Sequence, residues 1–196
     1  CSLHYNQTPS GWNGFTTLSD FYAKFDAADT RRGQAYPGVT NVSGLRVGLL
    51  LGQQFDQNGV ALQDRKGNPL SFTAAVKAIE TNPNTLEVTG IRVVKYPPDL
   101  TNGDNVDNDY VFLRLGDVLL MKAEAIQRGG TATLGQTTLS LVNLVRARSG
   151  APALGSVNAD QLLDERAREM YWEGWRRIDL VRFGKFNNPT QVRTAA

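Results

Sequence analysis

Three amphipathic segments in the second half of the chain constrain its fold more than any other feature. Each places apolar side chains at helical spacing, and the first two end at glycine residues. Asn158 suits the N-cap of the third segment, with Gln161 in capping-box position. Because no segment can bury its apolar stripe alone, we expect a helical hairpin with a third helix packed on it. The segments cover residues 110–128, 136–149 and 158–171, and a short helix is expected at 178–183.

The first half differs because turn-forming residues interrupt its apolar runs. Glycine, proline and asparagine punctuate residues 1–109, whereas helical patterns fill residues 110–196. We therefore predict a mainly α chain in one structural domain, with a loop-rich region at 1–109, a few short β-strands and a helical region at 110–196. Within the first region the patterns predict short helices at 17–25 and 71–80, strands at 45–51 and 90–96, and loops at 33–44 and 56–67.

Composition excludes several classes of function. Apolar residues make up 41% and charged residues 20%, which is ordinary for a globular chain, and the net charge of +2 gives no case for nucleic acid as a partner. No apolar run is long enough to span a bilayer. One cysteine, Cys1, and one histidine, His4, exclude an intrachain disulfide and a Cys/His zinc site, and they leave little room for nucleophilic catalysis.

The loop from Tyr5 to Phe15 is the best candidate for ligand binding. Trp12 follows Gly11 and precedes Asn13-Gly14, so the neighbouring glycines leave its indole unshielded. A flat aromatic face suits the apolar C–H face of a pyranose ring, and side-chain amides hydrogen-bond hydroxyl groups. The predicted glycan contacts are Tyr5, Asn6, Trp12 and Asn13. The alternative is that Trp12 folds back and caps the core, as large aromatic residues usually do.

An acidic run from Asp99 to Asp109 is a candidate metal site. Clustered carboxylate oxygens favour Ca²⁺, so the run predicts a calcium site at Asp104, Asp107 and Asp109. The spacing is not that of an EF-hand, because the sixth position from Asp104 is not glycine and the twelfth is Leu115 rather than glutamate. The alternative is an exposed turn. No other cofactor is expected.

The carboxylates of the third helix raise the question of a glycoside hydrolase, which needs two carboxyl groups facing one bond. However, arginines stand at helical spacing from these carboxylates, and ion pairing lowers a carboxyl pKa, which is wrong for a general acid. We therefore predict a structural network of arginine–carboxylate pairs, with Trp172 and Trp175 in the core between helices. The predicted pairs are Asp164 and Glu165 with Arg168, and Glu173 with Arg176 and Arg177, while Glu169 belongs to the same cluster.

Several motifs resemble those of the SusD/RagB family. The run YVFLRLGDVLLMKAEA (110–125) is similar to the helix that opens the family's C-terminal signature. The runs LSLVNLVRARSG (139–150) and LLDERAREMYWEGWRRIDLVRFGKF (162–186) are similar to the helices that follow. In the first half, NQTPSGWNGF (6–15) resembles a loop found in part of the family, and GIRVVKY (90–96) resembles the strand before the signature.

The resemblance implies a scaffold of tetratricopeptide-like helical hairpins with loop-rich decorations, in a protein that is not an enzyme. Such proteins are lipoproteins on the outer surface of the bacterial outer membrane. They bind oligosaccharides, or sometimes peptides, and deliver them to a SusC-like TonB-dependent transporter. Membrane contact is then expected only through a lipid anchor on the full-length protein. Family members are longer than this chain, so an N-terminal helical portion with part of the ligand surface is expected outside it.

Two interpretations of Cys1 follow, because a mature bacterial lipoprotein begins with a lipidated cysteine. The neighbouring segment 5–15 resembles sequence well inside the family, which favours a truncation point. Two functional hypotheses are also carried forward. The first is glycan capture, and the alternative is a helical interaction module that binds a peptide or another protein. An exposed Trp12 rimmed by amides favours sugar, whereas a long apolar groove favours peptide.

Overall fold

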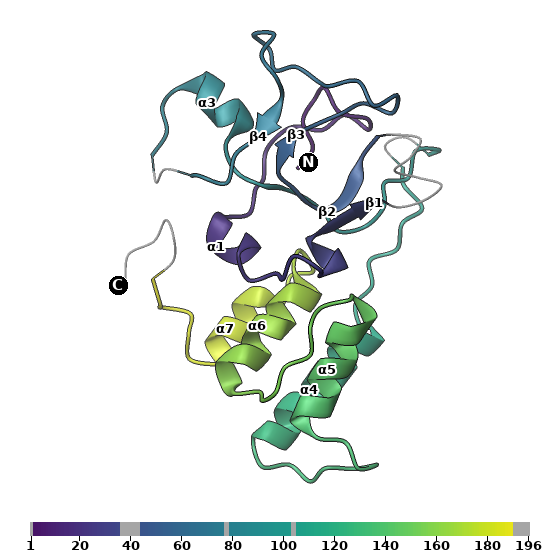
Figure 1. Ribbon diagram of the computed structural model, residues 1–196, viewed down its shortest axis with the longest axis vertical. Coiled ribbons are helices and arrows are strands. Elements are labelled where there is room, and N and C mark those ends of the chain that lie inside the picture. Colours follow the sequence, from purple (N-terminus) through teal and green to yellow (C-terminus); the bar gives the residue numbers. More distant parts are fainter. Residues whose placement is uncertain (1, 36–43, 77–78, 103–104, 190–196) are drawn as a thin grey trace. The chain divides into compact units, whose positions relative to one another are not determined.

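The computed structural model describes residues 2–35, 44–76, 79–102 and 105–189, and its chain divides into two compact units. Figure 1 shows the strands in the first unit and the four longest helices in the second. Helices predominate over short strands, which confirms the expected helix-dominated chain in this coarse form. The N-terminal unit comprises Cys1–Ala23, Arg32–Asn108 and Pro189–Ala196, and the C-terminal unit comprises Lys24–Arg31 and Asp109–Asn188.

Two small antiparallel sheets form the centre of the N-terminal unit. One has the order β1-β2-β5, and the other pairs β3 with β4. Close pairing of β1 with β2 requires Gly48, because a Cβ there would lie 2.6 Å from the Cα of Gly33. The strands are β1 (Gly33–Ala35), β2 (Arg46–Leu50), β3 (Gly52–Gln53), β4 (Ser71–Phe72) and β5 (Arg92–Val94). They bury a core of Leu45, Leu50, Leu70, Phe72 and Val94.

The elements predicted for the first half are confirmed in part. The strands expected at 45–51 and 90–96 form as β2 and β5, with narrower bounds. Of the helix expected at 17–25, α1 (Ser19–Tyr22) forms. The helix expected at 71–80 is wrong over its described residues, which begin with β4, and the loop expected at 33–44 begins with β1. Residues 36–43, 77 and 78 lie outside the described residues.

Two short helical elements were not predicted. They are η1 (Thr30–Arg32), a 3-10 turn, and α3 (Pro83–Val88). Asn82 caps α3 by accepting a hydrogen bond from the Asn84 N–H at 3.0 Å, and Pro83 occupies the first position, where a missing N–H costs little. This Asn-Pro start was visible in the sequence, but a helix this short shows no periodic apolar stripe.

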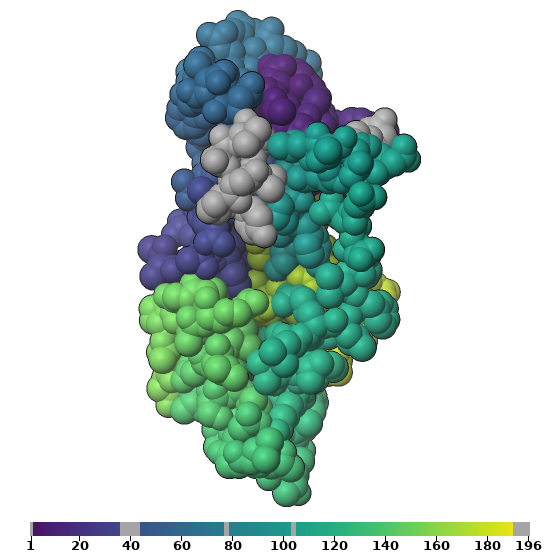
Figure 2. Space-filling view, turned by 90° about the vertical axis from the view of Figure 1, so that its right-hand side faces the viewer, coloured from purple at the N-terminus to yellow at the C-terminus, as the bar shows by residue number. Residues whose placement is uncertain are grey.

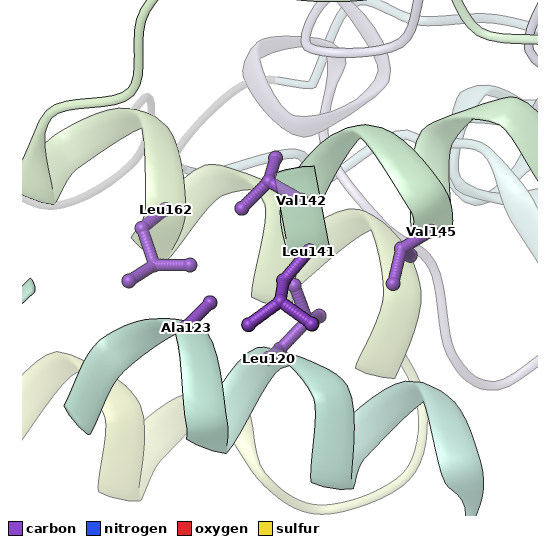
Figure 3. Packing of buried hydrophobic residues seen from close by; sticks show 6 residues of the cluster. All are labelled: Leu120, Ala123, Leu141, Val142, Val145 and Leu162. Carbon is purple, nitrogen blue, oxygen red and sulfur yellow. The ribbon is translucent and has the colours of Figure 1, made fainter. Parts of the chain in front are cut away.

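Four helices form the C-terminal unit, and the predicted helix pair with a third helix packed against it is confirmed. The side chain of Asn158 accepts from the Gln161 N–H at 2.9 Å, and the Gln161 side chain accepts from the Asn158 N–H at 2.8 Å, which is the predicted capping box. The helices are α4 (Leu115–Gln127), α5 (Thr138–Arg148), α6 (Ala159–Met170) and α7 (Arg176–Arg182). Their core contains Leu120, Ala123, Leu141, Val142, Val145 and Leu162 (Figure 3).

α4 begins later than predicted. Residues 110–114 are not helical, and residues 110–113 are exposed; Figure 2 shows the teal chain that leads into α4. Phe112 and Leu115, two apolar residues of the predicted helical segment 110–128, are 67% and 71% exposed. Arg114 has an extended backbone with φ of −143°, and its guanidinium donates to Glu173 at 2.8 Å, a tertiary contact that periodicity does not encode.

At 13 residues α4 is also the longest helix described, and no helix of the described ranges is long and apolar enough to cross a membrane.

A buried arginine joins three helices of the C-terminal unit. The Arg166 side chain on α6 is 2% exposed. It donates to Asp117 of α4 at 2.9 Å and to Asp179 of α7 at 3.0 Å. Arg182 also donates to Asp179, at 2.7 Å, and to Glu124 of α4, at 2.8 Å. Because an uncompensated buried charge is costly, these pairs fix how the three helices pack.

We predict that Arg166→Met lowers the free energy of unfolding by about 3–5 kcal/mol, because buried Asp117 loses its arginine partner and buried Asp179 keeps only Arg182. Urea unfolding followed by circular dichroism measures the change. Arg177→Met is the matched control, since Arg177 is exposed on the same unit, and it should change stability by less than about 0.5 kcal/mol. Equal stability of the two variants would show that the Arg166 pairs do not hold the helices together.

Candidate ligand-binding loop

The segment that carries Trp12 is fixed at its base by buried polar residues. His4 is fully buried and Gln7 is 5% exposed. The His4 carbonyl accepts from the N–H of Gln7 at 3.0 Å and from the N–H of Gly11 at 3.3 Å. Gly11 passes so close to Leu3 that a Cβ would lie 2.3 Å from the Leu3 carbonyl oxygen, so a larger residue does not fit without a shift. We call residues 4–13 the Trp12 loop.

Trp12 projects from this base into solvent and is 87% exposed. The next residue, Asn13, returns to the base by donating its N–H to the Leu3 carbonyl at 2.7 Å. Asn13 has φ of 56°, in the left-handed region that asparagine tolerates better than most residues. The alternative that Trp12 caps the core is therefore wrong.

Side chains of the loop also tie it to neighbouring turns. Asn6 donates from its side-chain amide to the Gln63 carbonyl at 2.8 Å, and Gln7 donates to the Gln54 side chain at 3.1 Å. Figure 2 shows the purple N-terminal segment lying against the blue part of the chain. The loop thus lies at the surface and is held both by hydrogen bonds within it and by hydrogen bonds to neighbouring turns.

Glu87, at the end of α3, gathers three groups of the site. Its Oε1 accepts from the Tyr5 hydroxyl at 2.6 Å and from the Arg65 N–H at 2.9 Å, and it lies 3.0 Å from the Nε2 of His4. The Nδ1 of His4 accepts from the Asn6 N–H at 3.0 Å, so in the neutral ring the proton is on Nε2 and points to Glu87. The Oε2 of Glu87 pairs with the Arg65 guanidinium at 2.9 Å.

Burial and hydrogen bonding shift the pKa of each of these groups. Burial lowers the pKa of His4 below 6.5, and the neighbouring Glu87 offsets this in part. Burial would raise the pKa of Glu87, but hydrogen bonds from Tyr5, Arg65 and His4 outweigh it and hold the pKa below 4.5. Burial and the bond to Glu87 raise the pKa of Tyr5 to about 12. At pH 7 the cluster holds a neutral imidazole, a carboxylate and a neutral phenol.

Arg92 of β5 supports the other end of the loop. It is fully buried, its guanidinium lies 4.4 Å from the centre of the Phe72 ring, and burial lowers its pKa to about 10, so it stays charged at pH 7. The Asn13 side chain accepts from Arg92 at 2.7 Å and donates to the Glu87 carbonyl at 2.8 Å. Arg92 also donates to the carbonyls of Glu87 at 2.8 Å, Thr89 at 2.6 Å and Gly90 at 2.7 Å.

The four predicted contact residues therefore lie on one loop, but they differ in how much of each side chain is available to a ligand. Trp12 is open to solvent, and Tyr5 is 43% exposed with its hydroxyl bound to Glu87. Asn6 uses its side-chain N–H to hold the loop, and Asn13 uses both ends of its amide. Glycan contact by these residues stays a prediction.

Sequence reasoning missed His4, Glu87 and Arg92 as parts of the site. His4 enters the sequence analysis only as an argument against zinc binding and nucleophilic catalysis, although a single histidine next to the candidate loop was a usable signal. Glu87 and Arg92 carry no such signal, because they lie more than 70 residues from the loop in sequence, as the separations of 82 for Tyr5–Glu87 and 79 for Asn13–Arg92 show.

The acidic run forms a hydrogen-bonded turn. The Asp99 carboxylate accepts from the Asn102 side chain at 2.8 Å, from the Thr101 N–H at 2.8 Å and from the Asp107 N–H at 3.1 Å, and these bonds hold its pKa well below the usual range. Asp107 and Asp109 are exposed, whereas Asp104 lies outside the described residues. Among described residues no group of three His, Cys, Asp or Glu side chains is placed to hold a metal ion.

The carboxylates of α6 and its end are structural. Glu165, Glu169 and Glu173 are at most 1% exposed. Burial would raise the pKa of Glu169, but the bond from Arg114 and nearby arginine charges outweigh it and lower the pKa. Carboxylates that are buried and bound by arginine side chains are unsuited to general-acid catalysis, so the predicted arginine–carboxylate network is confirmed for these residues. Glu165 pairs with Arg31, Arg146 and Arg168, Glu169 with Arg31, Arg114 and Arg148, and Glu173 with Arg114.

Some predicted partners and one predicted core position were wrong. Asp164 pairs with Lys24 at 2.8 Å instead of with Arg168, because Arg168 turns to Glu165. Trp172 is 47% exposed and has φ of 64°, so it does not lie in the core between helices. Helical spacing names neighbours on one helix, but it does not include partners that other segments supply.

Comparison with known proteins agrees with the motifs. A profile of the SusD family matches residues 4–194, and the chain belongs to this family, whose members are non-catalytic carbohydrate-binding proteins. Over 117 residues the chain is 35% identical to the starch-binding protein SusD of Bacteroides thetaiotaomicron. That match covers 56% of this chain and 20% of the relative, so the chain spans about a fifth of the relative's length.

We predict that Asn13→Ala lowers the free energy of unfolding of the N-terminal unit by about 1–3 kcal/mol, because buried Arg92 loses an acceptor. Asn13→Gly loses the same acceptor but relieves the left-handed backbone, so it should cost about 1 kcal/mol less. Thermal unfolding of both variants and the parent measures this. Parental stability in Asn13→Ala would show that the amide is free for ligand rather than engaged in the loop.

Proposed function

We propose that this chain is a glycan-binding part of a cell-surface protein, and that the Trp12 loop contacts the sugar. The observation that carries the proposal is an indole 87% exposed on a loop whose base is held by buried polar contacts. A fixed, exposed aromatic face binds a pyranose ring with little loss of conformational freedom. Family membership and the likeness to a starch-binding protein support a glycan as the ligand class.

The loop would offer polar contacts beside the indole. Tyr5 keeps a lone pair on its hydroxyl oxygen while it donates to Glu87, and the Asn6 amide oxygen is the end not used toward Gln63. Both would accept hydrogen bonds from sugar hydroxyls. Asn13, whose amide is engaged at both ends, would act mainly by holding Trp12 in place.

We further propose that the full-length protein is a lipoprotein on the outer surface of the outer membrane. It would deliver the bound oligosaccharide to a SusC-like TonB-dependent transporter. In that protein α4 and α5 would form one tetratricopeptide-like hairpin of a longer helical scaffold. The match to a longer relative over a fifth of its length supports the proposal that the hairpin belongs to a longer scaffold.

A second candidate function, binding of a peptide or another protein, is favoured by one observation. The chain that leads into α4 presents consecutive apolar side chains to solvent, and exposed apolar patches of this kind mark contact surfaces. The exposed fractions are 64% for Tyr110, 36% for Val111, 67% for Phe112 and 58% for Leu113, and Leu115 at the start of α4 is 71% exposed.

Calcium at Asp104, Asp107 and Asp109 stays a separate proposal. A higher melting temperature in CaCl₂ than in EGTA, abolished by Asp107→Asn, would support it. Identical melting curves under the two conditions would remove it.

We predict that Trp12→Ala lowers affinity for malto-oligosaccharides at least about tenfold, which is about 1.4 kcal/mol, while the melting temperature changes little. Isothermal titration and thermal unfolding measure the two quantities. Phe55→Ala is the matched control, because Phe55 is a 47% exposed aromatic outside the loop, and its affinity should equal that of the parent.

The same titration separates the two functions. A panel of plant and host oligosaccharides tests the glycan class, and casein-derived peptides serve as the contrast. Binding of peptides alone would move the assignment to the second candidate. A large drop in melting temperature for Trp12→Ala would show that the indole supports the fold, and the site assignment would fail.

A further inference from the structure

We infer that Glu87 and His4 form a latch that positions the Trp12 loop and releases it when His4 takes up a proton. Neither residue presents much surface, since His4 is fully buried and Glu87 is 6% exposed, so both act on a ligand only through the loop. The consequence for ligand rests on the proposed function: glycan affinity falls as the solution is acidified, although no titrating group touches the sugar.

The latch is built from local contacts around one imidazole. The backbone of His4 accepts from Gln7 and Gly11, and its own N–H donates to the Gln7 side chain at 2.9 Å. Its ring lies between a hydrogen-bond acceptor and a hydrogen-bond donor. Nε2 faces the Glu87 carboxylate at 3.0 Å, and Nδ1 faces the Asn6 N–H at 3.0 Å. The ring therefore joins the backbone of the loop to α3.

Protonation removes one of these two contacts. The proton can be added only at Nδ1, because Nε2 already carries hydrogen in the neutral ring. Nδ1–H and the Asn6 N–H would then be two donors aimed at each other, so the backbone at Asn6 must turn away. Asn6 and Gln7 hold the loop to its neighbouring turns, which means that this local change loosens the support beneath Trp12.

The charges that face His4 come from every neighbouring element. Glu87 on α3 and Asp64 in the adjacent turn favour the protonated ring, whereas Arg92 on β5 opposes it. Burial is the largest influence and also opposes it, since the ring packs 3.9 Å from the Tyr5 ring and 6.4 Å from Phe72. The net effect lowers the pKa of His4 below 6.5.

The sign of the pH dependence follows from this lowered pKa. Well above pH 6.5 the ring is neutral whether the loop is docked or released, so protonation does not affect docking. As the pH falls below 6.5, the released state binds a proton more readily than the docked state, and docking loses stability. His4 is the single histidine of the chain, and the pKa of Glu87 lies below 4.5, so a transition between pH 7 and 5 reports His4.

Amide hydrogen exchange tests the latch without any ligand. The amides of Gln7 and Gly11 donate to the His4 carbonyl, and the amide of Asn13 donates to the Leu3 carbonyl, so their protection factors, corrected for intrinsic exchange, report docking. One proton taken up over 1.5 pH units changes an equilibrium by at most about thirtyfold. Between pH 6.5 and 5.0 we expect protection of these amides to fall at least about threefold, while amides in the strands β2 and β5 keep theirs. Constant protection of the loop amides would overturn the latch.

Two variants separate a latch from a merely structural role. His4→Gln keeps an N–H donor toward Glu87 but cannot titrate, so its loop protection should not depend on pH. Glu87→Gln removes the charge that helps His4 bind a proton, so the transition should move to lower pH. If His4→Gln does not fold, the direction of the shift in Glu87→Gln decides, and an unmoved transition would overturn the latch.

Titration with malto-oligosaccharides at pH 7.0 and 5.5 then separates the latch from the proposed function. Affinity that falls together with loop protection in the parent, and stays constant in His4→Gln, supports both. Loop protection that changes with pH in a chain that binds none of the sugars supports the latch and removes the glycan function from this loop. Sugar binding with pH-independent affinity and protection overturns the latch and leaves the proposed function standing.

Discussion

Each unit of this protein contains a completely or almost completely buried arginine whose guanidinium must find an acceptor for its N–H groups. In the N-terminal unit Arg92 finds backbone carbonyls and the Asn13 side chain. In the C-terminal unit Arg166 finds the carboxylates of Asp117 and Asp179. Because an unsatisfied buried charge costs far more than a paired one contributes, these acceptors set which backbone segments must come together.

The two solutions have different consequences. In the C-terminal unit the carboxylate partners of Arg166 come from two other helices, so the ion pairs specify how three rigid helices pack, on a core that alone would tolerate other arrangements. Carbonyl partners in the N-terminal unit come from an irregular segment and the end of α3, so Arg92 specifies the path of loops. The ion pairs of Arg166 therefore stabilise a helical scaffold. The hydrogen bonds of Arg92 position the Trp12 loop, which regular secondary structure could not position.

The Trp12 loop shows how a small sheet unit can present a large aromatic residue to solvent. Its indole does not pack in the core. The conformation of the loop is instead held by polar residues on either side of Trp12: His4, Gln7 and Asn13. Glu87 and Arg92 supply the matching groups. A change of pH or a mutation at the residues that hold the loop would therefore alter ligand affinity. These residues are buried beneath the exposed part of the site.

The sequence by itself determined the helical C-terminal unit, because amphipathic periodicity, glycine ends and the Asn158–Gln161 capping box are local signals. It also identified the Trp12 loop, since flanking glycine leaves an indole without cover, and it carried the motifs of the SusD family. It did not show that α4 begins only after Arg114, that Trp172 is half exposed, or that Asn13 is engaged in holding the loop. Those outcomes depend on partners such as Glu173, Glu87 and Arg92, which lie tens of residues away along the chain. Only the tertiary structure decides them, because a hydrogen bond or ion pair depends on distance in space, and local sequence fixes distance only for near neighbours.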